Sequence, residues 1–145
     1  MDKLLVILGS TSTGKTDLAL KFAHKFRGEL VSVDSRQVYI NLDIGTGKLP
    51  GYEVTVKRGV GFWEMNGVKV WMYDVIGAKK QYTVYDYIQD AIKVINDIQN
   101  RGKLPILVGG TGFYLKALLE GLPNLEVPVN QKLRKQLDKL TIQQL

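Results

Sequence analysis

A short glycine-containing string near the N-terminus has the residue types and spacing of a phosphate-binding loop. Every fixed position of the motif G-x-x-x-x-G-K-[ST] is met by Gly9-Ser10-Thr11-Ser12-Thr13-Gly14-Lys15-Thr16. Glycines let the backbone curl until several N–H groups point at phosphate oxygens, and a following helix adds the partial positive charge of its N-terminus. The Lys15 ammonium would neutralise the outer phosphate, and the Thr16 hydroxyl would coordinate Mg²⁺. The string therefore predicts a P-loop that binds a phosphate or diphosphate group with a divalent metal.

Two further positions carry polar groups where an open α/β sheet places its ligand-binding groups. Asp34 follows a predicted strand at residues 29–33. A carboxylate there can hold a metal, orient it through water or take a proton from a nucleophile. The alternative is an aspartate that caps the turn at residues 35–37. In the string Gly109-Gly110-Thr111-Gly112 the Thr111 hydroxyl can contact a ligand, although a simple strand-to-helix turn explains this string almost as well.

The hydrophobic pattern predicts the elements that would position these groups. The apolar run at residues 4–8 predicts a central parallel strand buried on both faces. Helical spacing predicts a helix at residues 16–26, which Gly28 ends before the strand 29–33. A capping-box string from Thr83 to Asp86 opens a helix that stops at Gly102, and a strand at 104–108 and a helix at 113–120 follow. This order predicts an α/β fold with a P-loop NTPase-like parallel sheet flanked by helices.

Two segments differ from this alternation of strands and helices. Residues 52–76 alternate and are rich in valine and aromatic residues, and Asn66-Gly67 predicts a turn, so we expect a small β-hairpin excursion. Trp63, Trp71 and Tyr73 are candidates for stacking on bases, but aromatic side chains packed inward are the favoured interpretation. A linker at 123–130 leads to an amphipathic basic helix at 131–140. We therefore expect one core domain at residues 1–122, followed by the start of a helical region.

Composition excludes several classes of site. The 145 residues include no cysteine and a single histidine, His24, which removes disulfides, zinc–thiolate sites and cysteine nucleophiles. The formal net charge of +6 is a weak indication of a polyanionic partner. No apolar stretch approaches the roughly 18 residues of a membrane span. The default expectation is a cytoplasmic protein without a membrane partner, and a monomer is favoured.

Three strings together resemble the tRNA dimethylallyltransferases, also called tRNA isopentenyltransferases. The family's P-loop has the form G-x-T-x-x-G-K-T, which residues 9–16 match. Its pattern D-S-x-Q-V-Y-x-x-x-D-I-G-T-x-K is matched from Asp34 to Lys48, and R-G-K-x-P-I-L-V-G-G-T-G-x-Y is matched from Arg101 to Tyr114. The chain lacks the Pro-His-His-Leu string that many members carry before the helix at 84. The resemblance covers nearly the whole chain, but only about the first half of a typical member.

The resemblance implies an enzyme that moves a dimethylallyl group from dimethylallyl diphosphate to N6 of an adenosine next to the tRNA anticodon. It implies that the P-loop, with Mg²⁺, holds the diphosphate of the isoprenoid and that Asp34 is the general base. By the same resemblance, Thr11, Ser35, Gln37 and Thr111 help to hold or orient the substrates. Residues 123–145 would then be the start of a truncated second half. We expect such a chain to bind diphosphate and to catalyse more slowly than a full-length relative.

Two other functions are compatible with the residues. The first is a small P-loop kinase for nucleotides or metabolites, which would bind ATP and should show an arginine-rich lid. No such lid is evident between residues 110 and 145, although Arg134 and its neighbouring lysines leave some room for one. The second is a non-catalytic protein that binds tRNA or diphosphate without turnover. A change of Asp34 to alanine separates that binder from an enzyme, since only the enzyme would lose its rate.

Overall fold

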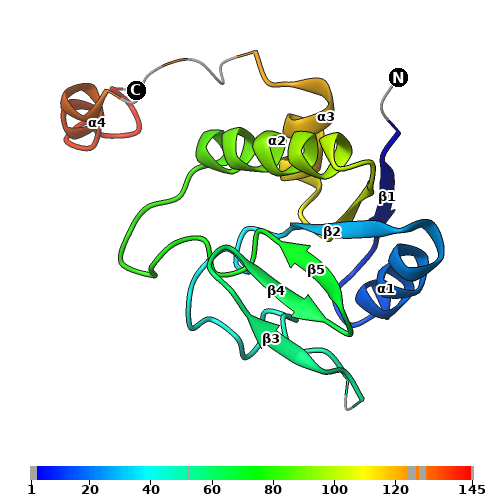
Figure 1. The fold of residues 1–145 in the computed structure, drawn as a ribbon. Coiled ribbons are helices and arrows are strands. Elements are labelled where there is room, and N and C mark those ends of the chain that lie inside the picture. The colour runs from blue at the N-terminus through cyan, green and yellow to red at the C-terminus, as the bar shows by residue number, and fades with distance from the viewer. Residues whose placement is uncertain (1–2, 52, 124–126, 128–129, 145) are drawn as a thin grey trace.

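The computed structural model describes residues 3–51, 53–123, 127 and 130–144. Within these ranges, six strands form one sheet in the order β1-β6-β2-β5-β4-β3 (Figure 1). The strands are β1 (Leu5–Leu8), β2 (Gly28–Val33), β3 (Val56–Arg58), β4 (Phe62–Met65), β5 (Val68–Trp71) and β6 (Leu104–Gly109). The helices are α1 (Lys15–Phe26), α2 (Val84–Asn100), α3 (Gly112–Glu120) and α4 (Gln131–Leu137). None of the described helices is long and apolar enough to cross a membrane.

Helices cover the two faces of the sheet and create two cores. Figure 1 shows α1 on one side of the sheet and α2 with α3 on the other. Because successive side chains of a strand point to opposite faces, Leu30 of β2 packs with Ala23 of α1. Val31, the next residue of β2, packs with Ile88 and Ala91 of α2. The predicted α/β fold of a sheet flanked by helices is therefore confirmed.

The parallel part of the sheet brings the carboxyl ends of β1, β6 and β2 to one edge. β2 and β6 run side by side from Gly28 opposite Leu104 to Val33 opposite Gly109. A side-chain carbon at Gly109 would lie 2.2 Å from the Val33 carbonyl oxygen, so only glycine permits this approach. The loops that follow these strands contain the P-loop string, Asp34 and Thr111.

Two details of the N-terminal region differ from the sequence-based predictions. β1 was expected at the centre of the sheet and buried on both faces, but within the described residues it pairs only with β6 and is half-buried. Its apolar run indicates a strand without showing how many neighbours that strand has. The helix α1 ends at Phe26 through Arg27, whose φ is 52°, and Gly28 begins β2. Gly28 pairs with Leu104 of β6, and a glycine is needed there because a side-chain carbon would lie 2.7 Å from the Leu104 carbonyl oxygen.

The segment predicted as a hairpin excursion belongs to the sheet. Asn66 and Gly67 both have positive φ and form the expected turn between β4 and β5. β5 also pairs in parallel with β2, so the antiparallel strands β3, β4 and β5 continue the sheet and make it mixed. Trp63 and Tyr73 are buried, which confirms the prediction that these aromatic side chains pack inward. They also contact each other edge to face, at 5.4 Å between ring centroids.

The C-terminal helix is shorter than predicted and lies on the surface. α4 ends at Leu137 instead of residue 140, and every one of its residues is exposed. Asn130 caps its first turn by accepting a hydrogen bond from the Leu133 amide at 2.9 Å. Most of the predicted linker at 123–130 lies outside the described residues. The proposed division of the chain at residue 122 stays a prediction.

A buried carboxylate ties β2 to the start of β6. The Glu29 side chain is only 2% exposed and accepts hydrogen bonds from Arg101, Lys103 and the indole of Trp71, all between 2.7 and 2.8 Å. Burial alone would raise the pKa of this carboxyl, but the hydrogen bonds from Arg101, Lys103 and Trp71 outweigh it and lower the pKa from 4.5 to about 2.

This shift predicts a specific acid sensitivity of the fold. A lowered pKa stabilises the folded state above pH 4.5, and that stabilisation of about 3 kcal/mol is lost as the pH falls from 4.5 towards 2. Urea unfolding at several pH values should show the gap in free energy between wild type and Glu29→Gln shrinking over this range. Asp97, the exposed partner of Arg101, offers a control. Asp97→Asn should lower the free energy of unfolding by less than about 1 kcal/mol. An equal pH dependence in wild type and Glu29→Gln would contradict the assignment.

Candidate functional site

A cavity of about 190 Å³ opens at the carboxyl edge of the parallel strands. Three loops enclose it, and each follows a different strand: β1, β2 and β6. The lining residues are 11–17 from the first loop and the start of α1, Asp34, Gln37, 46, 47 and 49–51 from the second loop, and 108–110 from the end of β6 and the third loop. Topology therefore brings together the P-loop string, Asp34 and the first two glycines of the third candidate group, Gly109 and Gly110. It adds a wall from residues 46–51.

The P-loop string folds into a tight curve that leads into α1. Ser12 and Gly14 have positive φ, at 63° and 78°. The Thr13 hydroxyl donates a hydrogen bond to the Ser10 carbonyl at 2.8 Å, and the Lys15 ammonium also contacts that carbonyl. α1 begins at Lys15, so the free amides and the positive end of its dipole lie at the cavity. This arrangement suits a bound anion.

One carboxylate oxygen of Asp34 is hydrogen-bonded to the backbone, and the other has no partner in the described chain. Its Oδ1 accepts hydrogen bonds from the backbone amides of Arg36 at 2.8 Å and Gln37 at 3.3 Å. The capping role that the sequence left open is therefore present. Its Oδ2 forms no hydrogen bond or ion pair with any residue of the described chain, and the side chain is 13% exposed at the cavity. A carboxylate fixed in this way can accept a proton or a ligand without losing its local structure.

Two phenols near Asp34 stay protonated. Burial raises the pKa values of Tyr73 and Tyr87 well above the ordinary range, and the carboxylate of Asp34 contributes to both shifts. The Tyr87 hydroxyl donates a hydrogen bond to the Ser32 carbonyl at 2.9 Å. A neutral Tyr87 therefore supports the end of β2 from the α2 side, two residues before Asp34.

Gln37 connects β2 to the cavity wall. Its amide oxygen accepts a hydrogen bond from the Ser32 hydroxyl at 2.5 Å, and its amide nitrogen donates to the Thr46 carbonyl at 2.8 Å. Gln37 was predicted to hold substrate, and although it lines the cavity, its side chain is engaged in this link. Sequence reasoning missed Ser32 and Thr46. Thr46 lies within a string quoted for the family resemblance, which was the available signal.

The remaining predicted substrate residues lie beside the cavity. The Ser35 amide donates a hydrogen bond to the Thr111 hydroxyl at 3.3 Å, so these two residues from different loops are brought together. Neither is among the residues that line the cavity, whereas Thr11 is. Gly9 and Ser10 begin the P-loop string but do not line the cavity. The Gly9 carbonyl oxygen would lie 3.2 Å from a side-chain carbon at Gly110, so the first and third loops approach each other closely.

The oxygen donors at the cavity suit a hard cation. Within the described residues, no three His, Cys, Asp or Glu side chains come together as a metal cluster. The Thr16 hydroxyl and the Asp34 carboxylate line the same cavity. Mg²⁺ prefers oxygen ligands and commonly takes one or two protein groups with phosphate oxygens and water. The donor set therefore fits Mg²⁺ bound together with a phosphorylated ligand.

Comparison with known proteins places the chain among transferases of one family. The family model "IPP transferase" matches residues 37–145, and the model "Isopentenyl transferase" matches residues 2–66. tRNA dimethylallyltransferase 1 of Parabacteroides distasonis is 40% identical over 99% of this chain and 44% of the relative. The tRNA dimethylallyltransferase of Streptococcus pyogenes serotype M49 is 45% identical over 90% of this chain and 40% of the relative. The chain thus spans less than half the length of these curated relatives.

Solved structures resemble the fold over nearly the whole chain. The full-length tRNA isopentenylpyrophosphate transferase from Bacillus halodurans superimposes with a TM-score of 0.74 at 33% identity, over 95% of this chain and 42% of that chain. A eukaryotic dimethylallyltransferase, captured in crystallographic snapshots acting on tRNA, superimposes with a TM-score of 0.75 at 32% identity, over 95% of this chain and 32% of that chain. The P-loop NTPase-like arrangement expected from the sequence is therefore shared with these enzymes.

Proposed function

The chain belongs to the IPP transferase family, and we propose that it transfers a dimethylallyl group from dimethylallyl diphosphate to N6 of an adenosine next to the tRNA anticodon. One observation carries the proposal: a phosphate-binding loop and a carboxylate with a free oxygen line the same cavity. A diphosphate site alone would serve many enzymes. The Asp34 carboxylate beside it supplies a proton acceptor for an amine nucleophile.

The reaction balances with the groups at the cavity. The N6 nitrogen forms a bond to the first carbon of the dimethylallyl group while the bond from that carbon to the diphosphate oxygen breaks. The N6 proton passes to Asp34, and diphosphate leaves with the bonding electrons. The P-loop amides and Lys15 stabilise the charge that develops on the leaving group. Mg²⁺, when bound, would add charge neutralisation at these oxygens, and Thr16 is the residue proposed to hold it.

The acceptor base must reach this cavity from a structured RNA. Enzymes that modify a base take it out of its stack, so we expect the adenosine to be flipped into the cavity. Ser35 and Thr111, which lie together beside Asp34, are proposed to orient the adenine or the diphosphate. A cytoplasmic place of action is part of the same proposal.

The test is transfer of labelled dimethylallyl from its diphosphate to unmodified tRNA in the presence of Mg²⁺. Incorporation at N6 is the expected result. A parallel thermal unfolding series compares dimethylallyl diphosphate with ATP, because a ligand of the folded state raises the melting temperature. Stabilisation by ATP alone, with phosphate transfer to a small acceptor, would favour a kinase. Stabilisation by diphosphate without any transfer would leave a non-catalytic binder and contradict the proposal.

A change at Thr16 tests the proposed metal ligand. Thr16→Val keeps the shape of the side chain and removes the hydroxyl. We therefore expect the factor by which Mg²⁺ increases the affinity for diphosphate to fall about tenfold. Titration calorimetry with inorganic diphosphate at several Mg²⁺ concentrations measures this, and binding without Mg²⁺ should hardly change. Thr55→Val, which changes an exposed threonine that does not line the cavity, is the matched control. An unchanged Mg²⁺ dependence in Thr16→Val would remove Thr16 from the metal site.

A further inference from the structure

A lysine with no exposed surface lies behind the wall of the cavity. The Lys48 ammonium donates hydrogen bonds to the Tyr39 carbonyl at 2.5 Å and to Asp74 at 2.6 Å, and it pairs with Asp43 at 3.4 Å. Burying a charge is costly unless partners satisfy it. An ammonium has three N–H groups, and here each has one acceptor. Lys48 ends the string from Asp34 that resembles the family, but its residue type and spacing alone indicate no role for it.

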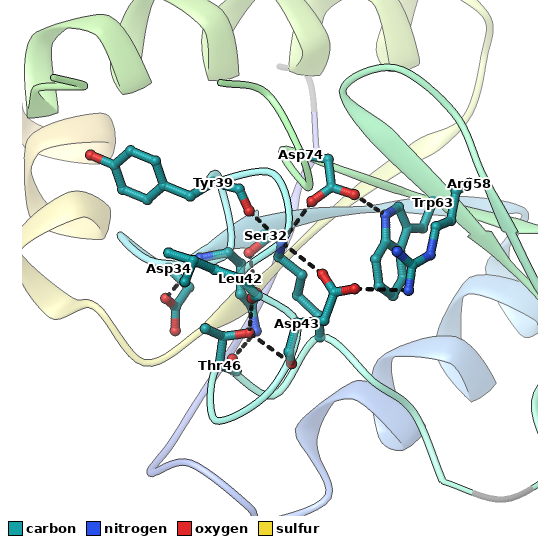
Figure 2. A network of polar contacts seen from close by, with 11 residues as sticks. Ser32, Asp34, Tyr39, Leu42, Asp43, Thr46, Arg58, Trp63 and Asp74 are labelled. Carbon is teal, nitrogen blue, oxygen red and sulfur yellow. Dashed lines mark hydrogen bonds and ion pairs between the residues drawn. The ribbon is translucent and has the colours of Figure 1, made fainter. Parts of the chain in front are cut away.

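The partners of Lys48 come from separate parts of the chain. Figure 2 shows Asp43, Asp74, Arg58 and Trp63 around this network. Asp74, which follows β5, also accepts a hydrogen bond from the Trp63 indole at 2.6 Å. Asp43 pairs with Arg58 of β3 at 2.8 Å, and the Arg58 guanidinium lies 4.3 Å from the Trp63 ring. Lys48 therefore joins the loop after β2 to the antiparallel strands.

The backbone on either side of Lys48 forms the cavity wall. Thr46, Gly47, Leu49 and Pro50 line the cavity, while the Lys48 side chain points into the network behind them. Leu49 is 54% exposed, so its apolar surface is available to a ligand. The P-loop offers polar groups to a ligand in the cavity, whereas Leu49 and Pro50 offer it an apolar surface.

We propose that Lys48 is a positioning residue, whose buried ammonium holds residues 46–50 in place so that this wall contacts the apolar group of the isoprenyl donor. The diphosphate end is held by the P-loop, independently of Lys48. The identity of the apolar group rests on the proposed function. Because inorganic diphosphate has no apolar group, contact with this wall would raise the affinity for dimethylallyl diphosphate only.

The experiment compares the affinity of the chain for these two ligands in three variants. Lys48→Met removes the ammonium and keeps an unbranched side chain. We expect it to weaken dimethylallyl diphosphate binding about tenfold and inorganic diphosphate binding less than about twofold. Arg58→Met removes an outer, half-exposed member of the network and should show a smaller effect of the same kind. Glu29→Gln disrupts the other buried ion cluster, at the opposite end of β2, and should change neither affinity.

Amide hydrogen exchange separates positioning from a general loss of stability. In the ligand-free protein, Lys48→Met should speed exchange at residues 46–49 and 51 more than in β6, whereas Glu29→Gln should not. Arg58→Met, which leaves Lys48 paired, provides the same comparison if Lys48→Met does not fold. The proposal is overturned if the variants at positions 48 and 58 lose affinity for both ligands equally, or if their exchange matches that of Glu29→Gln. A wild type that binds the two ligands equally would instead disprove the proposed donor, and with it this role of the wall.

Discussion

Asp34→Asn should reduce the rate of dimethylallyl transfer by about 10²- to 10⁴-fold, because it removes the proposed proton acceptor. Asparagine keeps a side-chain oxygen that can accept hydrogen bonds from the Arg36 and Gln37 amides, so the turn after β2 should be preserved. The loss should therefore fall on turnover, with the affinity for inorganic diphosphate nearly unchanged. Single-turnover transfer to unmodified tRNA measures the rate, and calorimetry measures the affinity.

The control for this change is a carboxylate away from the cavity. Asp90→Asn removes an acid from α2 that pairs with Lys93 on the surface, and its transfer rate should stay close to that of wild type. Retention of the wild-type rate within about threefold in Asp34→Asn would show that another group accepts the proton. In that case the free oxygen of Asp34 would have a binding role at most.

The second large effect is expected from Lys15→Met. Charge-assisted hydrogen bonds are worth about 1.5–3 kcal/mol, so we expect the affinity for inorganic diphosphate to fall about 10- to 100-fold. In the described structure the Lys15 ammonium contacts only the Ser10 carbonyl, and the fold should therefore tolerate its loss. Calorimetry gives the affinity, and a melting curve without ligand checks the stability.

A lysine on the same helix provides the comparison for Lys15. Lys21→Met changes an exposed residue of α1 that does not line the cavity, and diphosphate affinity should stay within about twofold of wild type. If both variants lose affinity equally, general positive charge would explain binding, and the specific role of Lys15 would be refuted. Repeating both titrations at high salt strengthens the comparison, because screening weakens only the general effect substantially.

Predictions that depend on neighbouring residues in the sequence agree with the structure. The capping box at Thr83 forms, with the Asp86 carboxylate accepting from the Thr83 amide at 2.8 Å. The Asn66-Gly67 turn forms with positive φ at both positions. The alternation of strands and helices, and hence the α/β class, was likewise readable from residue spacing. These features are set by hydrogen bonds and steric limits within a few residues, so a single sequence is enough to predict them.

Features that depend on distant segments could not be predicted in the same way. The apolar run of β1 does not show that β6 is its one described neighbour, and the valine pattern of β5 does not show that β2 pairs with it. Gly28 resembles a helix stop, yet its place in β2 follows from the approach of Leu104. In each case a long-range pairing, which local patterns do not encode, decided the outcome.

The candidate site likewise combines residues that local sequence patterns predict with residues that only long-range contacts bring into place. Residues 9–16 and Asp34 were recognisable because their chemistry depends on short spacings and on the end of a strand. The structure places residues 11–16 and Asp34 at one cavity. The wall at residues 46–51, the link through Gln37 and the buried pairs of Lys48 and Glu29 were not predicted. A charged side chain becomes buried only where partners from other segments satisfy it, and in this protein those partners lie up to 74 positions away, as between Glu29 and Lys103. Such pairing is a property of the folded chain, because it exists only once the strands have assembled.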